Sequence, residues 1–244
     1  DASLSEMLPD YSRSKITAWI KSGDALINQK PFKPKDKVNG NEVVYLTLNQ
    51  KQTNTWHAEK IPLNIVYEDE DIIVINKQFG LVTHPGAGNS SGTLANALLY
   101  YDSSLSILDR AGIVHRLDKN TSGLMVIARN ERSQKYLVEQ LQNHSVEREY
   151  SAIVYGHMIA GGTVDQPIGR DPKDRVKQAV LTHGKEAKTH YRAIDRFKSH
   201  THVKAILETG RTHQIRVHLS YIGHSLIGDP MYGGRVRFPK KASE

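Results

Sequence analysis

The sequence predicts an α+β protein of two domains, and the larger domain is expected to contain a mixed, mostly antiparallel sheet. From residue 61 onward, segments with strand character outnumber segments with helical periodicity. Before them, residues 49–60 are polar and follow neither period, which is typical of a linker between domains. We therefore expect a small domain at residues 1–48 and a second domain at residues 61–244.

The small domain has the pattern of two helices followed by two short strands. Apolar residues recur at helical spacing twice, at Leu4, Met7 and Leu8 and again at Ile16, Trp19 and Ile20. Ser12 is placed to cap the second helix and Gly23 to end it. Residues 25–29 and 42–48 then have the composition of short strands. We expect the apolar faces of both helices to form a core.

The second domain mixes strands with helices. Predicted strands lie at residues 71–76, 124–128, 150–155 and 203–207. Predicted helices lie near residues 93–101, 131–144 and 212–222. This excess of strands favours an α+β arrangement over a doubly wound α/β fold.

The charge balance suits a polyanionic partner. The chain has 33 Lys and Arg residues against 26 Asp and Glu, which gives a formal net charge of +7. The excess is uneven, because residues 111–244 hold 22 basic and 13 acidic side chains while residues 51–110 hold 4 and 7. Nucleic acid is therefore the favoured partner, and we expect its contacts mainly on the C-terminal part.

Other classes of function are disfavoured by what the sequence lacks. There is no Cys, which excludes disulfides, thiolate catalysis and Cys-ligated zinc. The 12 His residues form no His-Glu-x-x-His pattern, so we expect neither a metal nor another cofactor. No apolar run has the length of a membrane span and no signal peptide opens the chain, so we expect a cytoplasmic protein with no membrane partner.

One carboxylate stands out as a candidate for chemistry. Asp118 lies among His115, Arg116 and Lys119 on a segment that leads into a predicted strand. Nearby positive charges favour the ionised form of a carboxylate, so Asp118 would be ready as a nucleophile or base without a metal. Taken alone, however, an Asp in such a place is more often a turn residue in an ion pair.

A specific resemblance favours the catalytic interpretation. Residues 115–124, His-Arg-Leu-Asp-Lys-Asn-Thr-Ser-Gly-Leu, resemble the signature of the RluA-type pseudouridine synthases. The resemblance makes Asp118 the catalytic carboxylate. It further implies that Arg216, in the His-Gln-Ile-Arg sequence, pairs with that Asp, and that Tyr150, in Arg-Glu-Tyr, is an active-site aromatic residue.

The resemblance extends over nearly the whole chain, including residues 76–86 and 228–234. It implies that residues 1–48 are an S4-like RNA-binding domain, which we expect to start inside its first helix, and that the catalytic domain continues beyond residue 244. It also implies a substrate in large-subunit ribosomal RNA, in free RNA or in an assembling subunit. Expected RNA contacts are Arg13, Lys15, Lys21, His115, Arg116 and Arg211.

Such an enzyme isomerises uridine without redox change or hydrolysis, so the resemblance implies no cofactor. The target base must leave its stack, and we expect Arg116 to help fill the vacated space. Asp118 either abstracts a ribose proton or adds to C1′, and the sequence leaves both routes open. Tyr150 is expected to stack on the extruded uracil.

Two other functions compete with this interpretation. A non-catalytic RNA-binding or ribosome assembly factor would account for the basic charge and the S4-like domain, but not for Asp118, Tyr150 and Arg216 together. A glycoside hydrolase normally needs two well-placed carboxylates, and the sequence offers one strong candidate. We expect the protein to be a monomer.

Overall fold

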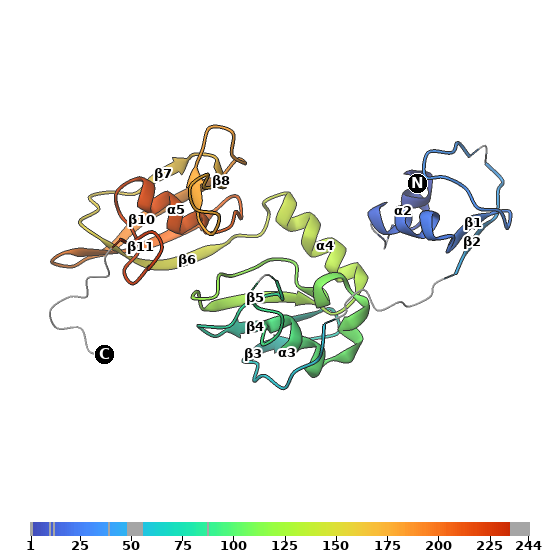
Figure 1. Ribbon diagram of the computed structural model, residues 1–244, viewed down its shortest axis with the longest axis horizontal. Helices are drawn as coiled ribbons and strands as arrows, with labels where there is room; N and C mark the ends of the chain where they lie inside the picture. The colour runs from blue at the N-terminus through green and yellow to red at the C-terminus, as the bar shows by residue number, and fades with distance from the viewer. Residues whose placement is uncertain are drawn as a thin grey trace. The chain divides into compact units, whose positions relative to one another are not determined.

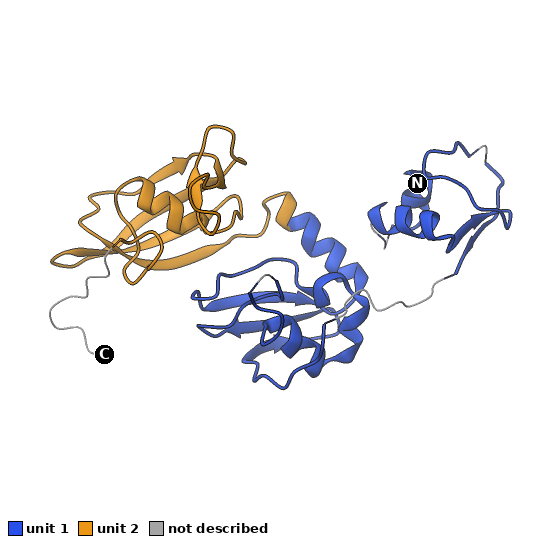
Figure 2. Ribbon diagram, viewed as in Figure 1, with its two compact units in different colours: residues 1–140 blue, residues 141–244 orange. Residues whose placement is uncertain are grey.

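The computed structural model describes residues 2–9, 11, 13–38, 40–47, 56–86 and 88–234 (Figure 1). Its contacts divide the chain into two compact units, residues 1–140 and 141–244 (Figure 2). Two features predicted from the sequence lie outside the described residues, namely Ser12 and most of the linker at 49–60.

The N-terminal module, residues 2–47, has the predicted two helices and two short strands. These elements are α1 (Ala2–Met7), α2 (Arg13–Ser22), β1 (Ala25–Ile27) and β2 (Val44–Leu46). The two strands pair antiparallel, with Ala25 opposite Leu46. Gly23 follows α2 with a φ of +81°, a backbone conformation that glycine adopts without strain and that ends the helix as predicted.

The core of this module comes from the apolar positions predicted for its helices, with one exception. Buried residues from α1, α2 and β1 form the core, and Trp19 packs against it while partly buried. Met7 was expected on the inner face of the first helix, but its side chain is 68% exposed. The expectation was wrong: Met7 is the last residue of α1, and Leu8, just beyond the helix, packs against the core in its place.

The first unit also contains a three-stranded antiparallel sheet in the order β3-β4-β5. Its elements, in chain order, are β3 (Ile65–Glu68), β4 (Ile72–Lys77), α3 (Leu94–Tyr101), the 3₁₀ turns η1 (Ser103–Ile107) and η2 (Asp109–Gly112), β5 (Gly123–Ala128) and α4 (Glu131–Gln142). The strands predicted at 71–76 and 124–128 and the helices predicted near 93–101 and 131–144 are confirmed. Burial alternates along β4, so that Ile73, Ile75 and Lys77 are buried on one face.

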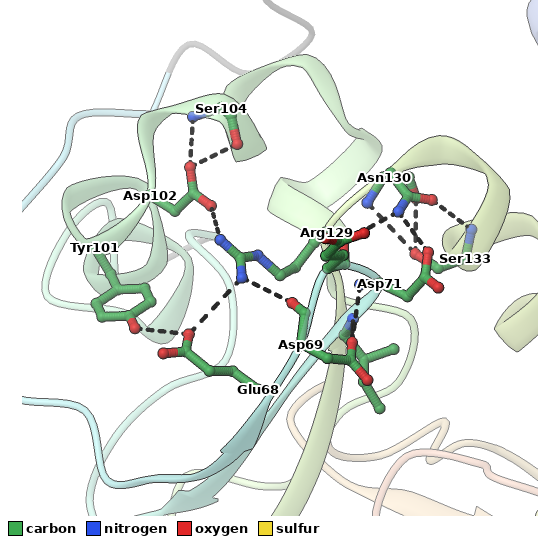
Figure 3. Close-up of polar contacts among 11 residues, drawn as sticks. Glu68, Asp69, Asp71, Tyr101, Asp102, Ser104, Arg129, Asn130 and Ser133 are labelled. Atoms are coloured by element: carbon green, nitrogen blue, oxygen red, sulfur yellow. Dashed lines mark hydrogen bonds and ion pairs between the residues drawn. The ribbon is translucent and has the colours of Figure 1, made fainter.

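Arg129, directly after β5, ties three parts of this unit together (Figure 3). Its Nη1 donates to the backbone oxygen of Asp69 at 2.8 Å, and its Nη2 donates to Asp102 Oδ2 at 3.1 Å. Glu68 lies 3.9 Å from the same guanidinium and accepts a hydrogen bond from the Tyr101 hydroxyl. The end of β5, the β3–β4 turn and the end of α3 are therefore cross-linked by one side chain.

A second set of bonds continues the network into α4 (Figure 3). Asn130 Nδ2 donates to Asp71 Oδ1 at 2.8 Å, while Asn130 Oδ1 accepts the backbone N–H of Ser133 at 2.8 Å. The first turn of α4 is thus capped by a side chain that also holds the β3–β4 turn.

The second unit is built on a four-stranded antiparallel sheet in the order β6-β11-β10-β7. The strands β8 and β9, which lie between β7 and β10 in the sequence, form a separate hairpin. Its elements are β6 (Glu149–Tyr155), β7 (Gly162–Asp165), β8 (Ile168–Arg170), β9 (Gln178–Val180), β10 (Lys188–Arg196), β11 (His200–Leu207) and α5 (Gln214–Tyr221). The strands predicted at 150–155 and 203–207 and the helix near 212–222 are confirmed. Leu219 of α5 packs against Val154 and Val203, so α5 covers one face of this sheet.

The α+β class is confirmed. Among the described residues, each unit holds one larger sheet and one two-stranded sheet, β3-β4-β5 and β1-β2 in the first unit and β6-β11-β10-β7 and β8-β9 in the second. In the described part of the chain, all pairings between named strands are antiparallel, and parallel pairing occurs only as the isolated bridge between Val82 and Thr93. No helix among these residues is long and apolar enough to cross a membrane.

Candidate active site

The segment that carries Asp118, residues 112–121, is here called the Asp118 segment. Its start is fixed against the β3-β4-β5 sheet. Gly112 has a φ of +78°, and a Cβ at this position would lie 2.0 Å from the backbone oxygen of Ala128. Only glycine fits there. Beyond it, the N–H of Val126 in β5 donates to His115 Nε2 at 3.1 Å, so His115 anchors the segment to the strand.

Hydrogen bonds also hold the residues on both sides of Asp118. The Thr83 hydroxyl donates to the backbone oxygen of Leu117 at 2.8 Å, and the N–H of Gly80 donates to the backbone oxygen of Lys119 at 2.9 Å. The N–H of Thr121 donates to the backbone oxygen of Asp118 at 3.1 Å, which closes the following turn. The side chain of Asp118 itself is partly exposed. A partly accessible carboxylate on a fixed backbone suits catalysis.

Lys77, at the end of β4, lies beside this carboxylate. It is 1% exposed, and its ammonium donates to the backbone oxygens of Leu81 at 2.9 Å, Gln78 at 3.0 Å and Lys119 at 3.3 Å. Burial lowers the pKa of Lys77, and the negative charge of Asp118 opposes that shift. Lys77 therefore joins the end of β4 to the Asp118 segment by hydrogen bonds and by charge.

The motifs did not identify Lys77, although the sequence carries a signal for it. The residue continues the two-residue period of Ile73 and Ile75, which assigns its side chain to the buried face of β4. A lysine at an inward position must find partners for its ammonium. The identity of those partners could not be predicted, because Lys119 is 42 residues away in the chain.

The cations predicted to surround Asp118 have different surroundings. Arg116 and Lys119 are exposed, whereas His115 is held to β5. The positive charge of Arg116 also affects the pKa of His84. The His84 ring packs against Trp56, with ring centroids 6.0 Å apart. Burial and the positive charges of Arg110 and Arg116 lower the pKa of His84 to about 4, so this imidazole is neutral near pH 7.

In the second unit, Tyr150 lies on β6 opposite Ala205 of β11. Two residues earlier, Arg148 donates from Nη2 to the backbone oxygen of Glu208 at 2.7 Å. Burial lowers the pKa of Arg148, and the neighbouring Arg211 lowers it further, while Tyr150 acts in the opposite direction. Arg211 is exposed, and its Nε donates to the backbone oxygen of Glu186 at 2.8 Å.

Arg216, on α5, forms a bidentate ion pair with Asp229. Its Nε donates to Asp229 Oδ2 at 2.8 Å and its Nη2 donates to Oδ1 at 2.9 Å. Asp229 is 7% exposed. Its burial alone would raise the pKa of this carboxyl, but the hydrogen bonds from Arg216, Met231 and Tyr232 outweigh burial and lower it. The sequence motifs predict Arg216 as a site residue, which stays a prediction, and they give no indication of Asp229.

A comparison with models of known protein families assigns the chain to a family. The model described as RNA pseudouridylate synthase matches residues 71–221. The chain belongs to the RNA pseudouridylate synthase family. The match contains Asp118, Tyr150 and Arg216, together with His115, Arg116 and Arg211.

Relatives in the pseudouridylate synthase family match the chain from end to end. Ribosomal large subunit pseudouridine synthase D of Escherichia coli strain K12 is 55% identical over 245 residues, which cover 100% of this chain and 75% of the relative. The protein of the same name from Xanthomonas campestris is 50% identical over 244 residues, covering 100% of this chain and 74% of the relative. RNA pseudouridylate synthases are isomerases, so the chain is classed as an enzyme.

Solved pseudouridylate synthase structures share the fold. Human RNA pseudouridylate synthase domain containing 1 superimposes with a TM-score of 0.58 at 27% identity, covering 70% of each chain. Human RNA pseudouridylate synthase domain containing 4 gives a TM-score of 0.56 at 28% identity, covering 74% of this chain and 73% of the other.

The predicted RNA contacts of the N-terminal module lie outside the pseudouridylate synthase match. Arg13 and Lys21 are exposed on α2. Lys15 lies over the rings of Tyr11 and Trp19, at 5.3 Å and 5.5 Å from their centroids. Lys15 also forms an ion pair with Glu131 of α4.

The structure distributes the predicted catalytic residues over both units of the synthase. Asp118 belongs to the unit of residues 1–140, while Tyr150 and Arg216 belong to the unit of residues 141–244. The pairing of Arg216 with Asp118 therefore stays a prediction. Within the described residues, no group of three or more His, Asp or Glu side chains is arranged to hold a metal ion.

Proposed function

We propose that this chain converts specific uridines of large-subunit (23S) ribosomal RNA into pseudouridine. The observation that carries the proposal is the 55% identity, over the whole chain, to a protein named ribosomal large subunit pseudouridine synthase D. The fixed Asp118 segment supports it, because it offers a carboxylate of defined position within the family match.

The reaction breaks the bond between N1 of uracil and C1′ of the ribose, rotates the base, and joins C5 to C1′. C5 loses a proton and N1 gains one, so the product is an isomer of the substrate. Asp118 is proposed as the catalytic carboxylate. It either adds to C1′, so that the ribose is held as an ester while the base is separated, or removes a ribose proton. Both routes need an ionised Asp118.

The other predicted residues have supporting roles in this proposal. Arg216 binds the Asp118 carboxylate through charge-assisted hydrogen bonds, for which a guanidinium is better suited than an ammonium. Tyr150 stacks on the extruded uracil and offers its hydroxyl for proton transfer. Arg116 fills the space that the base leaves. Arg211 contacts RNA phosphates, and His115 holds the segment from which Arg116 projects.

The N-terminal residues are proposed to bind RNA as an S4-like domain at 1–48, joined by a linker at 49–60 to the catalytic domain at 61–244. Arg13 and Lys21 are exposed on α2, where they are accessible to phosphates. Lys15 would contribute at the same surface, beside the Tyr11 and Trp19 rings. We propose that the protein acts as a monomer in the cytoplasm, during assembly of the large ribosomal subunit.

The test is pseudouridine formation in large-subunit RNA transcripts, mapped by chemical modification and primer extension. Asp118→Asn keeps the shape of the side chain and removes its charge, so we expect product to be lost. Asp109→Asn is the matched control, because the Asp109 side chain is 82% exposed and lies in the same unit. Its product yield should equal that of the unmodified chain.

Two outcomes would contradict the proposal. Site-specific product at the normal rate from Asp118→Asn would exclude this carboxylate from the chemistry. Tight RNA binding by the folded chain with no product from any RNA of the large subunit would instead favour an RNA-binding or assembly role. Tyr150→Phe separates stacking from proton transfer, since full activity of this variant would exclude the hydroxyl.

A further inference from the structure

The ion pair between Arg216 and Asp229 fixes the guanidinium in one orientation. Asp229 accepts from Nε and Nη2, which form the side-on edge of the planar guanidinium. A bidentate pair of this kind defines both the position and the plane of the group. Asp229 is only 7% exposed, so water has little access to compete for its hydrogen bonds.

Asp229 is itself held by the turn that follows it. Its Oδ1 accepts the N–H of Met231 at 2.9 Å and the N–H of Tyr232 at 3.1 Å. The turn closes tightly at Gly233, where a Cβ would lie 2.5 Å from the backbone oxygen of Asp229. The carboxylate therefore has four hydrogen bonds, two to the turn and two to Arg216.

Tyr232 constrains the face of the same guanidinium. The Arg216 Cζ lies 4.9 Å from the centroid of the Tyr232 ring, within the range of a cation–π contact. The ring is anchored through its hydroxyl, which accepts the N–H of Gln178 at 2.8 Å and is hydrogen-bonded to His213 Nδ1 at 2.8 Å. His213 precedes α5 directly, and Gln178 begins β9.

We propose that Asp229 and Tyr232 are positioning residues for Arg216. Asp229 fixes the side-on edge of the guanidinium, and Tyr232 fixes its plane. This inference rests on the proposed function, in which Arg216 binds the catalytic carboxylate. It assigns a role to residues 228–234, which the proposed mechanism does not otherwise use.

Asp229 and Tyr232 together, here called the clamp, determine which edge of the Arg216 guanidinium can bind a second carboxylate. A guanidinium has two bidentate edges, the side-on edge with Nε and one Nη, and the end-on edge with both Nη atoms. Because Asp229 takes the side-on edge, the end-on edge is the one from which Arg216 would donate to the catalytic carboxylate in the proposed function. Loss of the Asp229 carboxylate removes the two hydrogen bonds that orient the side-on edge, so its effect is on turnover more than on RNA affinity.

Asp229→Asn tests the clamp without disrupting the turn. The amide oxygen replaces Oδ1 and accepts from Met231, Tyr232 and Arg216 Nη2, while the amide N–H₂ faces Arg216 Nε and cannot accept its proton. Asp69→Asn is the matched control, since Asp69 Oδ1 also accepts two backbone N–H groups, both at 2.8 Å, and bonds to no guanidinium through its carboxylate.

The first readout is the single-turnover rate on a target RNA, measured with the dissociation constant of the same RNA. For Asp229→Asn we expect the rate to fall by about tenfold to a hundredfold, which corresponds to loss of one charge-assisted hydrogen bond. The RNA dissociation constant should change less than about twofold, because no phosphate contact is removed. Asp69→Asn should leave both quantities unchanged.

The second readout is the exchange of the Arg216 Nε proton with water, followed by NMR in the free protein. We assign the resonance by its absence in Arg216→Lys. It should exchange at least about tenfold faster in Asp229→Asn than in the unmodified chain, because the acceptor of this proton is lost. Asp69→Asn should leave the exchange rate unchanged.

The outcomes separate this inference from the proposed function. Absence of product from the unmodified chain would contradict the proposed function itself, and full activity of Arg216→Lys or Asp118→Asn would contradict the role proposed for that residue. Loss of activity in those variants, with a normal rate or unaltered Nε exchange in Asp229→Asn, would overturn only the clamp. A fall in RNA affinity as large as the fall in rate would also overturn it, because Asp229 would then act on RNA binding.

Discussion

Replacing Lys77 by Met should destabilise the unit of residues 1–140. Methionine has a similar length and volume to lysine but no donor, so the change removes the buried ammonium and leaves the strand packing in place. The backbone oxygens of Gln78, Leu81 and Lys119 lose their common partner. The Asp118 segment then loses one of its attachments to β4.

The size of the effect follows from the surroundings of these three oxygens. The bond to Leu81 is buried, so its oxygen is left unpaired at a cost of about 1–3 kcal/mol. The bonds to Gln78 and Lys119 are partly buried, and water can replace them at roughly 0.5 kcal/mol or somewhat more each. We expect a total loss of about 2–4 kcal/mol, equivalent to a fall in Tm of roughly 4–16 °C for a chain of this length.

Urea and thermal unfolding of the complete chain measure this loss. Lys119→Met is the control, because that side chain is exposed and should change stability by less than about 0.5 kcal/mol. The deficit of Lys77→Met should also grow as the pH rises. Burial lowers the pKa of Lys77 below its ordinary value of 10.5. Between these two values the unfolded chain binds more protons than the folded chain, so the unmodified protein becomes more stable as the pH rises. If Lys77→Met unfolds within about 0.5 kcal/mol of the unmodified chain, the reasoning is refuted.

Three further predictions concern the same unit. Gly112→Ala should lower the free energy of unfolding in urea by about 2–5 kcal/mol, because of the positive φ and the contact with Ala128. Gly80 has a similar φ but open space around it, so Gly80→Ala should lower the free energy of unfolding by only about 1–2 kcal/mol. The pKa of His84 is lowered to about 4, so stability should fall as the pH drops from 6.5 to 4. This effect, on the order of 1–2 kcal/mol after solvent screening, should vanish in His84→Phe; an unaltered pH profile in that variant would contradict it. Arg129→Lys keeps the charge but not the fork of donors, and should cost about 1–2 kcal/mol in thermal unfolding; a fully stable variant would show that charge alone suffices.

The parts of the fold that could be predicted from the sequence are those with a local signal. The helices α3, α4 and α5 and the strands β4, β5, β6 and β11 follow from the spacing of apolar residues along a few turns or pairs. Met7 shows the limit of this reasoning, since it has the predicted spacing from Leu4 and lies in α1 but is exposed at the end of that helix. The distribution of strands over four sheets depends in part on long-range pairing, which periodicity does not encode.

The candidate site shows the same division. Asp118, Tyr150 and Arg216 were identified from short motifs, and their surroundings were not. Lys77 receives a hydrogen-bond acceptor from a residue 42 positions later, and Arg216 receives its carboxylate from Asp229 beyond the end of its helix. Such partners are chosen by tertiary structure, so a sequence can indicate that a buried lysine or arginine needs one without identifying it.

The strand order of the first sheet bears on how the protein is made. β4 is the middle strand, and its second neighbour, β5, begins 46 residues after β4 ends. During synthesis the β3–β4 hairpin therefore leaves the ribosome with one edge unpaired and with Lys77 lacking the backbone oxygen of Lys119. The nascent chain must therefore remain incompletely folded until β5 has emerged. A pause in translation before that point would prolong the exposure of a sheet edge, which can pair with other chains.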